Sequence, residues 1–490
     1  MLKRLIGFWS GQGGAKGDAS SRAPIIVPAN EHDVHESDFS RSALKVLKKL
    51  DEAGHASYLV GGGVRDALVG LKPKDFDIAT DASPETVRKL FRNSRIIGRR
   101  FKLVHVVYGR EIIEVATFRA AHTKGDGGET VESGRIVRDN VYGSIEEDAC
   151  RRDFSVNALY YNIADGSVVD FVGGLDDLDQ RLFRLIGDPA TRCAEDPVRV
   201  LRAVRLAAKL EFDMEAKTLE AMRASSSELG STAPARLFEE VLKLFQGGYA
   251  LRSFAAVREH DLLQYLFPLL NKRLANREQK LETMLQTALE NTDKRVAVGK
   301  PITPAYLLAF MLWPDVEERA LRDSTAGMPI QEAMRLAADD IIKDQLRVTS
   351  IPRRFSGPMR EIWHMQPRLE SARGERALRL MEDRRFRAAY DFLCLRASVD
   401  PRLADVAKWW TDVQRLPEDQ RGKSVEKRPL AMGIWGAIPR TATARLQVQL
   451  RRRKNVGVGV GASRVATRKH HLRTRDQFRA CPLGLRRCRQ

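Results

Sequence analysis

Polar and apolar residues alternate in short runs in the first part of the chain and recur at helical spacing in the second part. Between residues 58 and 120 the alternation predicts strands, together with one helix at residues 84–91. Two more strands are predicted near residues 159–162 and 168–171. After Asp188 the spacing is that of helices. The pattern therefore predicts an α+β protein, a small head with a mixed sheet followed by an elongated all-α neck and body.

Proline, glycine and charge divide these regions further. Residues 1–40 are aperiodic and contain Gly, Ser and Pro, which predicts a flexible leader. In the helical part, boundaries between helices are expected at Pro234, Gly247-Gly248, Pro304 and Pro352. The predicted organisation is a leader (1–40), a head (41–187), a helical neck (188–250), a helical body (251–416) and a basic, disordered tail (417–490).

Positive charge is concentrated at the C-terminus. The 490-residue chain has a net charge of +19, and residues 421–490 contain 19 Lys and Arg against 2 acidic residues, so they contribute +17 and residues 1–420 only +2. A polycationic end is typical of sequence-independent binding to nucleic-acid phosphates. The alternative is a solvated, disordered end with no dedicated partner.

The cysteines and the hydropathy pattern indicate an intracellular enzyme. Five cysteines are scattered along the chain without a Cys-x-x-Cys pair, which argues for a reducing compartment and against a zinc site. No apolar run is long enough to cross a bilayer, and the apolar residues from Leu5 to Trp9 are too few for a signal sequence. We therefore expect a cytoplasmic protein with no stable membrane insertion.

The main chemical signal is a pair of aspartates one residue apart, Asp75 and Asp77. On a strand, alternate side chains share a face, so the two carboxylates point the same way while Phe76 points into the core. Two carboxylates on one face repel each other unless a cation lies between them, and hard oxygen ligands suit Mg²⁺. Without further context, an Asp-x-Asp pair is more often a solvated turn.

A glycine turn, Gly61-Gly62-Gly63, precedes this pair. Glycines allow the backbone to approach a phosphate closely, and a helix opening at Val64 would direct its N–H groups toward it. The run is neither a Walker A loop nor a Gly-x-Gly-x-x-Gly fingerprint, and an ordinary strand–helix turn is the alternative. A phosphate turn combined with metal-binding carboxylates suggests nucleotidyl transfer.

The motifs that follow carry a resemblance to a known family. Glu114 lies on the polar face of a predicted strand. The later motifs are Arg151-Arg152-Asp153-Phe154-Ser155-Val156-Asn157, Glu195-Asp196-Pro197-Val198-Arg199 continued by Arg202 and Arg205, and Pro234-Ala235-Arg236-Leu237-Phe238. In this order they resemble those of the class II nucleotidyltransferases, which comprise bacterial poly(A) polymerases and CCA-adding tRNA nucleotidyltransferases. The resemblance extends from about residue 42 to about residue 416.

Three segments are closer to the poly(A) polymerase branch. They are Gly98–Val106, Phe386–Leu393 and Lys408–Trp410. The resemblance implies a head of the polymerase β type, an RNA-binding body and the transfer of AMP from ATP to RNA 3′ ends with release of pyrophosphate.

The resemblance also implies roles for individual residues. Asp75 and Asp77 would hold Mg²⁺, and Asp153 and Glu114 are the remaining catalytic candidates. The triphosphate would lie along the glycine turn and nearby arginines, which suit phosphate because the guanidinium is always charged and can bind bidentately. The candidates for that role are Gly62, Gly63, Arg65, Arg151, Arg152 and Asn157.

The motif beginning at Glu195 would read the base. On a helix, Asp196, Arg199 and Arg202 lie along one face, and Arg205 continues the row. In the family this face presents a fixed hydrogen-bond pattern to the incoming base. The alternative for these residues is a surface ion-pair ladder.

Three functions stay open at this point. The first is a template-independent poly(A) polymerase, the second is a CCA-adding tRNA nucleotidyltransferase, and the third is a non-catalytic RNA-binding protein on a transferase scaffold. The intact pair of Asp75 and Asp77 argues against the third. The segment Gly98–Val106 and the basic tail favour the first over the second.

Overall fold

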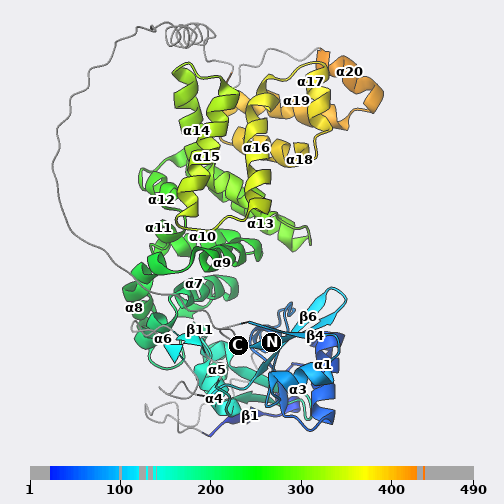
Figure 1. The fold of residues 1–490 in the computed structure, drawn as a ribbon, viewed down its shortest axis with the longest axis vertical. Helices are drawn as coiled ribbons and strands as arrows, with labels where there is room; N and C mark the ends of the chain where they lie inside the picture. Colours follow the sequence, from blue (N-terminus) through cyan, green and yellow to red (C-terminus); the bar gives the residue numbers. More distant parts are fainter. Residues whose placement is uncertain are drawn as a thin grey trace, which may run out of the picture. The chain divides into compact units, whose positions relative to one another are not determined.

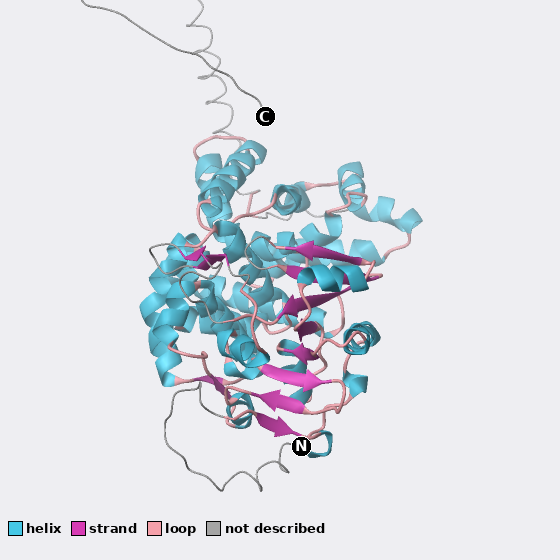
Figure 2. Cartoon of the chain, turned by 60° about the horizontal axis from the view of Figure 1, so that its bottom comes forward, coloured by secondary structure: helices cyan, strands magenta, loops and turns pink. Residues whose placement is uncertain are grey.

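The N-terminal region is built on a mixed eight-stranded sheet. The computed structural model describes residues 23–98, 102–120, 129–130, 136–138, 141–426 and 434–435. The strands follow the order β1-β10-β9-β2-β3-β6-β5-β4 (Figures 1 and 2). They are β1 (Ile25–Val27), β2 (Ser57–Val60), β3 (Asp77–Thr80), β4 (Ser94–Ile97), β5 (Leu103–Tyr108), β6 (Glu111–Thr117), β9 (Leu159–Asn162) and β10 (Val168–Asp170). Neighbouring strands are antiparallel except β3 and β6, which are parallel, so the predicted mixed sheet is confirmed.

Two helices of the head begin with serine caps. Ser40 accepts a hydrogen bond from the Ala43 N–H at the start of α1 (Arg41–Glu52), which buries its apolar face in the core of the head. Ser83 caps α3 (Pro84–Leu90) in the same way. The other head helices are α2 (Gly62–Leu68), α4 (Ile145–Arg151) and α5 (Gly174–Asp179). Two small sheets pair β7 (Glu129–Thr130) with β8 (Ile136–Arg138) and β11 (Leu182–Phe183) with β12 (Asp213–Met214).

The expected flexible leader of residues 1–40 is wrong from Ile25 onward. β1 pairs with β10 at the edge of the sheet, and Val27 is buried. Short 3₁₀ helices follow at Ala29–Glu31 and Glu36–Asp38. Three strand residues are too few to show an alternation, so only the partner strand reveals the element. Residues 1–22 lie outside the described residues, as do Arg99 to Phe101 of the segment quoted above.

Beyond the head the described chain is helical, with β12 as an exception. The helices are α6 (Pro189–Glu195), α7 (Val198–Leu210), α8 (Ala216–Ser225), α9 (Pro234–Gln246), α10 (Ala250–Glu259), α11 (Leu263–Leu266), α12 (Pro268–Ala275), α13 (Gln279–Ala297), α14 (Pro304–Thr325), α15 (Ile330–Leu346), α16 (Arg353–Ser371), α17 (Glu375–Met381), α18 (Phe386–Ala397), α19 (Ala404–Arg415) and α20 (Glu418–Glu426). The helix boundaries predicted at the three prolines are confirmed, because α9 begins at Pro234, α14 begins at Pro304 and Pro352 is the N-cap residue of α16.

The body packs around buried aromatic side chains. α14, α15 and α16 pack against one another, and α16 also contacts α18 (Figure 1). Trp313, Trp363 and Trp410 are almost wholly buried. The indole N–H groups of the last two donate to the carbonyls of Ala309 (3.1 Å) and Leu369 (2.9 Å). Each buried polar edge is therefore satisfied by a helix backbone.

The predicted boundary of the tail at residue 417 is also wrong. Residues 418–426 form α20, which packs on α17 and α19. Beyond it, Ile434 and Trp435 are buried, and the Trp435 backbone N–H donates to Glu370 Oε2 at 3.4 Å. The first residues of the basic segment thus belong to the body. The remainder of the predicted tail, residues 436–490, lies outside the described part.

Candidate active site

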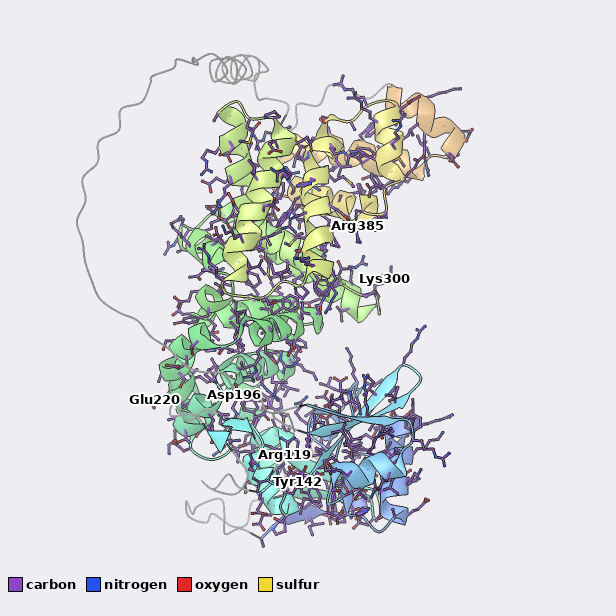
Figure 3. All side chains as sticks on the ribbon, in the orientation of Figure 1. Arg119, Tyr142, Asp196, Glu220, Lys300 and Arg385 are labelled. Carbon is purple, nitrogen blue, oxygen red and sulfur yellow. The ribbon has the colours of Figure 1, made fainter. Side chains whose placement is uncertain are left out.

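A polar cavity of about 350 Å³ lies between the sheet and the helices α4, α6 and α7. Its lining combines six arginines with four carboxylates and a few apolar residues. The lining residues are Val60, Asp77, Ile78, Leu103, Glu114, Ala116, Arg119, Asp148, Arg151, Arg152, Arg192, Asp196, Arg199 and Arg202. Figure 3 labels two of them, Arg119 from the head and Asp196 from the neck. A cavity of this composition suits a polyanionic ligand that also carries a cation.

Two carboxylates stand side by side in the sheet at this cavity. Asp77 is the first residue of β3, and Glu114 is its register partner on the parallel strand β6. Both side chains are exposed, whereas the next residues of their strands, Ile78 and Val115, are buried. Partial loss of solvent and the charge of Glu114 raise the pKa of Asp77 to about 6. A cation beside these carboxylates would relieve the repulsion, so the geometry supports the role predicted for Asp77 and Glu114.

Asp75 does not lie on the strand that the sequence predicts for it. β3 begins at Asp77, and Asp75 belongs to the segment before it. The burial pattern is nevertheless the expected one, since Asp75 and Asp77 are exposed and Phe76 between them is buried. Asp75 is absent from the cavity lining, but its charge also contributes to the raised pKa of Asp77. It therefore stands near the cavity rather than in its wall.

The glycine turn reaches the site through Gly61, which the prediction did not select. Gly61 has φ +80°, and a Cβ there would lie 3.6 Å from Arg152 Nη1 and 3.8 Å from Asp77 Oδ2. α2 opens at Gly62 rather than at the expected Val64. A Cβ on Gly63 would meet the Asp75 carbonyl at 3.1 Å, so this glycine is required for packing. Of the three, Gly61 brings the backbone closest to the carboxylate and the arginine.

Arg65 is buried in the head rather than exposed to a phosphate. Only 3% of its side chain is exposed, and it contacts the carboxylate of Asp66 and the side-chain oxygen of Asn157. Asp66 also accepts from Lys209 on α7 at 2.6 Å. Arg65 and Asn157 are absent from the cavity lining. These contacts give Arg65 and Asn157 a structural role that ties α2 to the neck and to the Arg-Arg-Asp motif, and their contact with nucleotide stays a prediction.

Arg151 and Arg152, which are predicted to bind nucleotide, line the cavity. Arg152 donates to Asp148 Oδ2 (3.0 and 3.2 Å) and to the hydroxyl of Tyr160 (3.0 Å), and this hydroxyl itself donates to Asp148 at 2.8 Å. Arg151 donates to the Ala120 carbonyl at 2.5 Å. These contacts hold the two guanidinium groups at the cavity wall, where they suit a phosphate.

The base-selection motif of the neck is held by ion pairs. Asp196 accepts a bidentate pair of hydrogen bonds from Arg236 of α9, at 2.9 and 2.8 Å. Arg199 donates to Glu195 (2.9 Å) and to the carbonyl of Arg192 (2.5 Å). The ion-pair ladder offered as an alternative thus exists in part, yet Asp196, Arg199 and Arg202 also line the cavity.

Arg205 is the member of that row which does not reach the cavity. Its Nε donates to Glu240 Oε2 of α9 at 3.2 Å, and Glu240 also pairs with Lys243. Only 13% of the Arg205 side chain is exposed. Arg205 thus forms a helix–helix ion pair, and its contact with nucleotide stays a prediction.

Asp153 connects the head to the neck. Its carboxylate lies 2.5 Å from Arg202 Nη2 and accepts from Asn157 Nδ2 (3.2 Å) and from the Phe154 N–H (2.9 Å). Burial alone would raise its pKa, but Arg202 and the Asn157 hydrogen bond hold the pKa below its ordinary value. Asp153 does not line the cavity. Its geometry fits a residue that positions Arg202 rather than a metal ligand.

Four residues of the site were not selected from the sequence. Asp148 orients Arg152, Arg119 and Arg192 line the cavity, and Arg236 binds Asp196. Arg236 belonged to a quoted motif and Asp148 lies four residues before Arg152, so the spacing on α4 was the available signal. Within the described residues, the Nε groups of Arg192 and Arg202 are buried without a hydrogen-bond partner.

A divalent cation fits the carboxylates of the site. Among the described residues no group of three or more His, Cys, Asp or Glu side chains is arranged to hold a metal ion. Asp77 and Glu114 provide a pair, with Asp75 nearby, and loss of solvent together with the charge of Glu114 raises the pKa of Asp77. Mg²⁺ typically takes one or two carboxylates and completes its shell with water and substrate phosphates.

None of the helices that the structure describes is long and apolar enough to span a bilayer.

Comparison with known protein families matches three segments of the chain. Residues 57–184 match the poly A polymerase head domain, residues 211–274 a probable RNA- and SrmB-binding site of polymerase A, and residues 326–454 the arginine-rich C-terminus of polymerase A. The first match contains the sheet except β1, and the cavity carboxylates Asp77, Glu114 and Asp148. The second begins within the neck after α7.

Similar proteins include both branches named above. Poly(A) polymerase I of Salmonella typhimurium is 45% identical over 406 residues, which are 81% of this chain and 87% of that protein. The CCA-adding enzyme of Bacillus pumilus is 35% identical over 248 residues, or 51% of this chain and 60% of that protein. The solved structure of the Bacillus stearothermophilus CCA-adding enzyme in complex with CTP has a TM-score of 0.51 at 23% identity and covers 86% of this chain and 100% of that one. The last similarity supports the head-and-helical-body fold.

Proposed function

Because the chain belongs to the bacterial poly(A) polymerase I family, a branch of the class II nucleotidyltransferases, we propose that it is a polynucleotide adenylyltransferase. It adds AMP from ATP to RNA 3′ ends without a template and releases pyrophosphate, in RNA polyadenylation and turnover. The observation that carries this proposal is the cavity in which Asp77 and Glu114 face six arginines. Carboxylates and guanidinium groups converge there from the head and from the neck.

The carboxylates are the proposed centre of the reaction. Asp77 and Asp75 would hold Mg²⁺, with Glu114 as the adjacent carboxylate, and the bound ion would stabilise negative charge on the attacking and leaving oxygens. The protein's own contribution is to keep Asp77 at the start of β3 beside Glu114, where the pKa of about 6 leaves it ionised at neutral pH. Protonation would remove the charge that the ion requires.

The arginines are proposed to bind and orient ATP. Arg151 and Arg152 are fixed by Ala120 and Asp148, so their guanidinium groups need little reordering when a triphosphate binds. Arg192 and Arg202 line the same cavity and would add two further guanidinium groups. Gly61 lets the backbone approach the same region without a Cβ. Together these groups would hold the α-phosphate near Asp77.

Base choice is assigned to the neck. Asp196 and Arg199 are fixed by Arg236 and Glu195, so each would present its remaining hydrogen-bonding edge in one orientation. A rigid pattern of this kind discriminates between bases because a mismatched base leaves polar groups unpaired. Arg202, which Asp153 orients, would contribute to the same face. The proposal places this reaction in the cytoplasm, where a protein with scattered free cysteines and no Cys-x-x-Cys pair is stable.

One assay separates the three candidate functions. The purified full chain is incubated with Mg²⁺, a non-tRNA oligoribonucleotide and each nucleoside triphosphate in turn. Extension with ATP alone is the expected result. Use of CTP on a tRNA that lacks its 3′ end would instead indicate a CCA-adding enzyme. Binding of RNA without extension under all conditions would overturn the proposal and indicate a non-catalytic protein.

A further inference from the structure

The strand beside Glu114 brings a histidine against this carboxylate. His105 of β5 is the register partner of Glu114 on the antiparallel strand β6. Its ring nitrogen Nε2 lies 3.2 Å from Glu114 Oε1. His105 belongs to the segment Gly98–Val106 noted above, and the proposed reaction gives it no role. Its contact with one of the cavity carboxylates therefore needs an explanation.

Alternation along β5 determines the face on which His105 lies. Val104 and Val106 are buried in the core of the head, so His105 between them points to the opposite face of the sheet. Leu103, two residues earlier on that same face, lines the cavity. His105 itself is not part of the cavity lining. It therefore stands behind the site and would act on the reaction through a neighbouring side chain.

His105, Glu114 and Asp77 form one row across three strands. Glu114 is in register with His105 on one side and with Asp77 on the other. Side chains in register on neighbouring strands have Cβ atoms about 4.5–5.5 Å apart, close enough to contact each other directly. The histidine thus flanks the pair of carboxylates that the proposed function places at the centre of the reaction.

The surroundings of the imidazole determine which of its nitrogens carries the hydrogen. An ionised carboxylate only accepts hydrogen bonds, so Nε2 of His105 donates to Glu114. The other nitrogen, Nδ1, is buried and has no hydrogen-bond partner among the described residues. A hydrogen on Nδ1 would be an unsatisfied buried donor, which favours the tautomer with the hydrogen on Nε2.

Glu114 is the member of the carboxylate pair that most needs such a donor. Its side chain has one more rotatable bond than that of Asp77, and 48% of it is exposed. A long, exposed carboxylate samples several rotamers, and fixing it costs side-chain entropy. The His105 side chain is only 14% exposed and is held on a central part of β5. It can therefore provide a fixed point to which the carboxylate is tied.

We propose that His105 is a positioning residue, which donates a hydrogen bond from Nε2 to Glu114 and fixes the orientation of this carboxylate beside Asp77. The inference rests on the proposed adenylyl transfer for the role of the two carboxylates. With Oε1 engaged by His105, Oε2 of Glu114 is the oxygen that remains for a cation.

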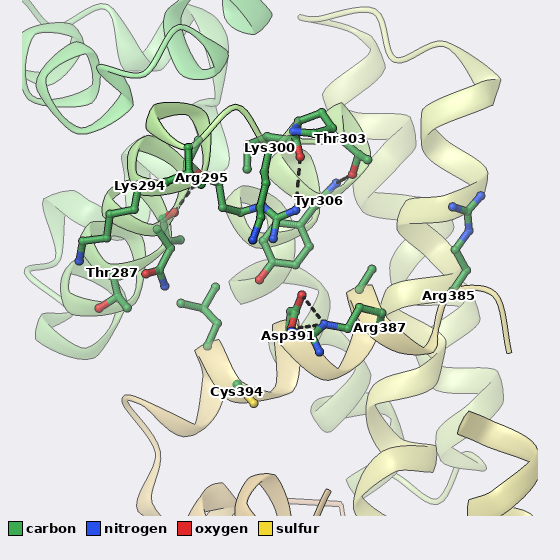
Figure 4. Close-up of a pocket in the computed structure, with 18 of the residues that line it drawn as sticks. Thr287, Lys294, Arg295, Lys300, Thr303, Tyr306, Arg385, Arg387, Asp391 and Cys394 are labelled. Carbon is green, nitrogen blue, oxygen red and sulfur yellow. Dashed lines mark hydrogen bonds and ion pairs between the residues drawn. The ribbon is translucent and has the colours of Figure 1, made fainter. Parts of the chain in front are cut away.

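The test compares two substitutions of His105 with a matched control. His105→Leu removes the donor, whereas His105→Gln keeps an N–H donor near the position of Nε2. The control is His55→Leu, because His55 Nδ1 lies 3.0 Å from Asp81 in the head and neither residue lines the cavity. None of these substitutions changes the body, including its groove of about 690 Å³ among α13, α14 and α18 (Figure 4).

Metal binding is measured without turnover. Mn²⁺ replaces Mg²⁺, and its binding is followed by electron paramagnetic resonance with a non-hydrolysable ATP analogue and no RNA. We expect His105→Leu to bind Mn²⁺ about 3- to 10-fold more weakly than the wild type, which is the size of one partly exposed hydrogen bond. His105→Gln and His55→Leu should bind Mn²⁺ as the wild type does, and equal losses in the Leu and Gln variants would contradict a donor role.

The tautomer is measured in the wild-type protein and depends on no variant. Nitrogen NMR of the chain with labelled histidine should show the hydrogen of His105 on Nε2. A hydrogen on Nδ1 would overturn the proposal even if His105→Leu failed to fold, which urea titrations of each variant would reveal.

Steady-state kinetics separate positioning from a general loss of structure. In His105→Leu, kcat should fall by about 3- to 10-fold while the KM for ATP stays unchanged, because the arginines of the cavity are untouched. In a Glu114→Gln background the same substitution should cause no further loss, since His105 acts through that carboxylate. A full further loss in that background would show that His105 acts in another way.

The outcomes distinguish this inference from the proposed function. A wild-type protein that extends no RNA would refute the proposed function, while the Mn²⁺ measurements would still decide the role of His105. An active wild-type protein whose His105→Leu variant matches it in both Mn²⁺ binding and kcat would refute this inference alone.

Discussion

Replacing Asp153 with asparagine removes one negative charge at the joint between head and neck and keeps the size of the side chain. In the wild type the carboxylate pairs with Arg202 at 2.5 Å and accepts from Asn157 and from the Phe154 backbone. An asparagine can still accept one of these hydrogen bonds, but its amide N–H would face the donors of Arg202. We therefore expect Arg202 to lose its fixed orientation while the fold persists.

The exposed fractions of the two partners set the size of the effect. The Asp153 side chain is 13% exposed and that of Arg202 is 41% exposed. Breaking a buried pair costs about 3–5 kcal/mol, whereas an exposed pair contributes about 0–1 kcal/mol. Because Arg202 can regain water, we expect the free energy of unfolding to fall by about 1–3 kcal/mol.

The pH dependence follows from the lowered pKa of Asp153. A carboxyl group whose pKa is lower in the folded state stabilises the protein above its ordinary pKa of 3.8 and loses that contribution as pH falls through its folded value. The difference in stability between wild type and variant should therefore be largest near neutral pH and shrink at acidic pH. Urea unfolding at several pH values measures it.

Steady-state kinetics decide between a positioning role and a metal-binding role for Asp153. A loss of about 1–2 kcal/mol at Arg202 corresponds to a rise of roughly 5- to 30-fold in the KM for ATP. The dependence of the rate on Mg²⁺ concentration should stay unchanged, because Asp153 does not line the cavity. If the variant instead lost all turnover and required more Mg²⁺, Asp153 would be a metal ligand and our interpretation of its contacts would be refuted.

Four further predictions address other parts of the molecule. Asp77→Asn should abolish AMP transfer without unfolding the protein, and a normal rate in the purified variant would exclude a catalytic role for Asp77. In the wild type at limiting Mg²⁺, the rate should fall as pH drops through about 6, and the acidic limb of the pH–rate profile should move to lower pH at higher Mg²⁺. Arg199→Ala should weaken the preference for ATP in competition assays more than it weakens RNA binding, and an unchanged preference would leave Arg199 as only the ion-pair partner of Glu195. Arg396→Leu removes the guanidinium that pairs with the buried Glu370 and should lower the free energy of unfolding by about 3–5 kcal/mol in urea titrations. An unchanged free energy of unfolding would show that this pair does not stabilise the body. Deletion of residues 440–490 should weaken RNA binding and flatten its salt dependence while the free energy of unfolding stays unchanged. Deletion of residues 427–490 also removes the buried Trp435 and should lower the free energy of unfolding by on the order of 3 kcal/mol. Equal stability of the two deletion variants would contradict the packing of that side chain.

The sequence alone was sufficient for the class of fold. Alternation and helical spacing are local properties, so they located the strands of the head, the cap of α3 and the prolines that begin α9 and α14. The order of short motifs identified the family and selected Asp77 and Glu114 from separate segments. Their position on adjacent strands is consistent with that choice. The edge strand β1 was not predicted, because three residues are too few to show a period-two alternation of polar and apolar side chains.

The partner of each arginine was decided only by the tertiary structure. Arg65, Arg199 and Arg205 all look alike in sequence, as cations near motifs of the site. In the fold, Arg65 is buried against Asn157, which is 92 residues away, while Arg205 pairs with Glu240, 35 residues away. A guanidinium binds whichever carboxylate or amide the packing of distant segments brings within about 3 Å, and helical spacing specifies only the face on which it starts. That is why sequence identified the chemistry of the site, and packing determined which of its charges remain open to a substrate.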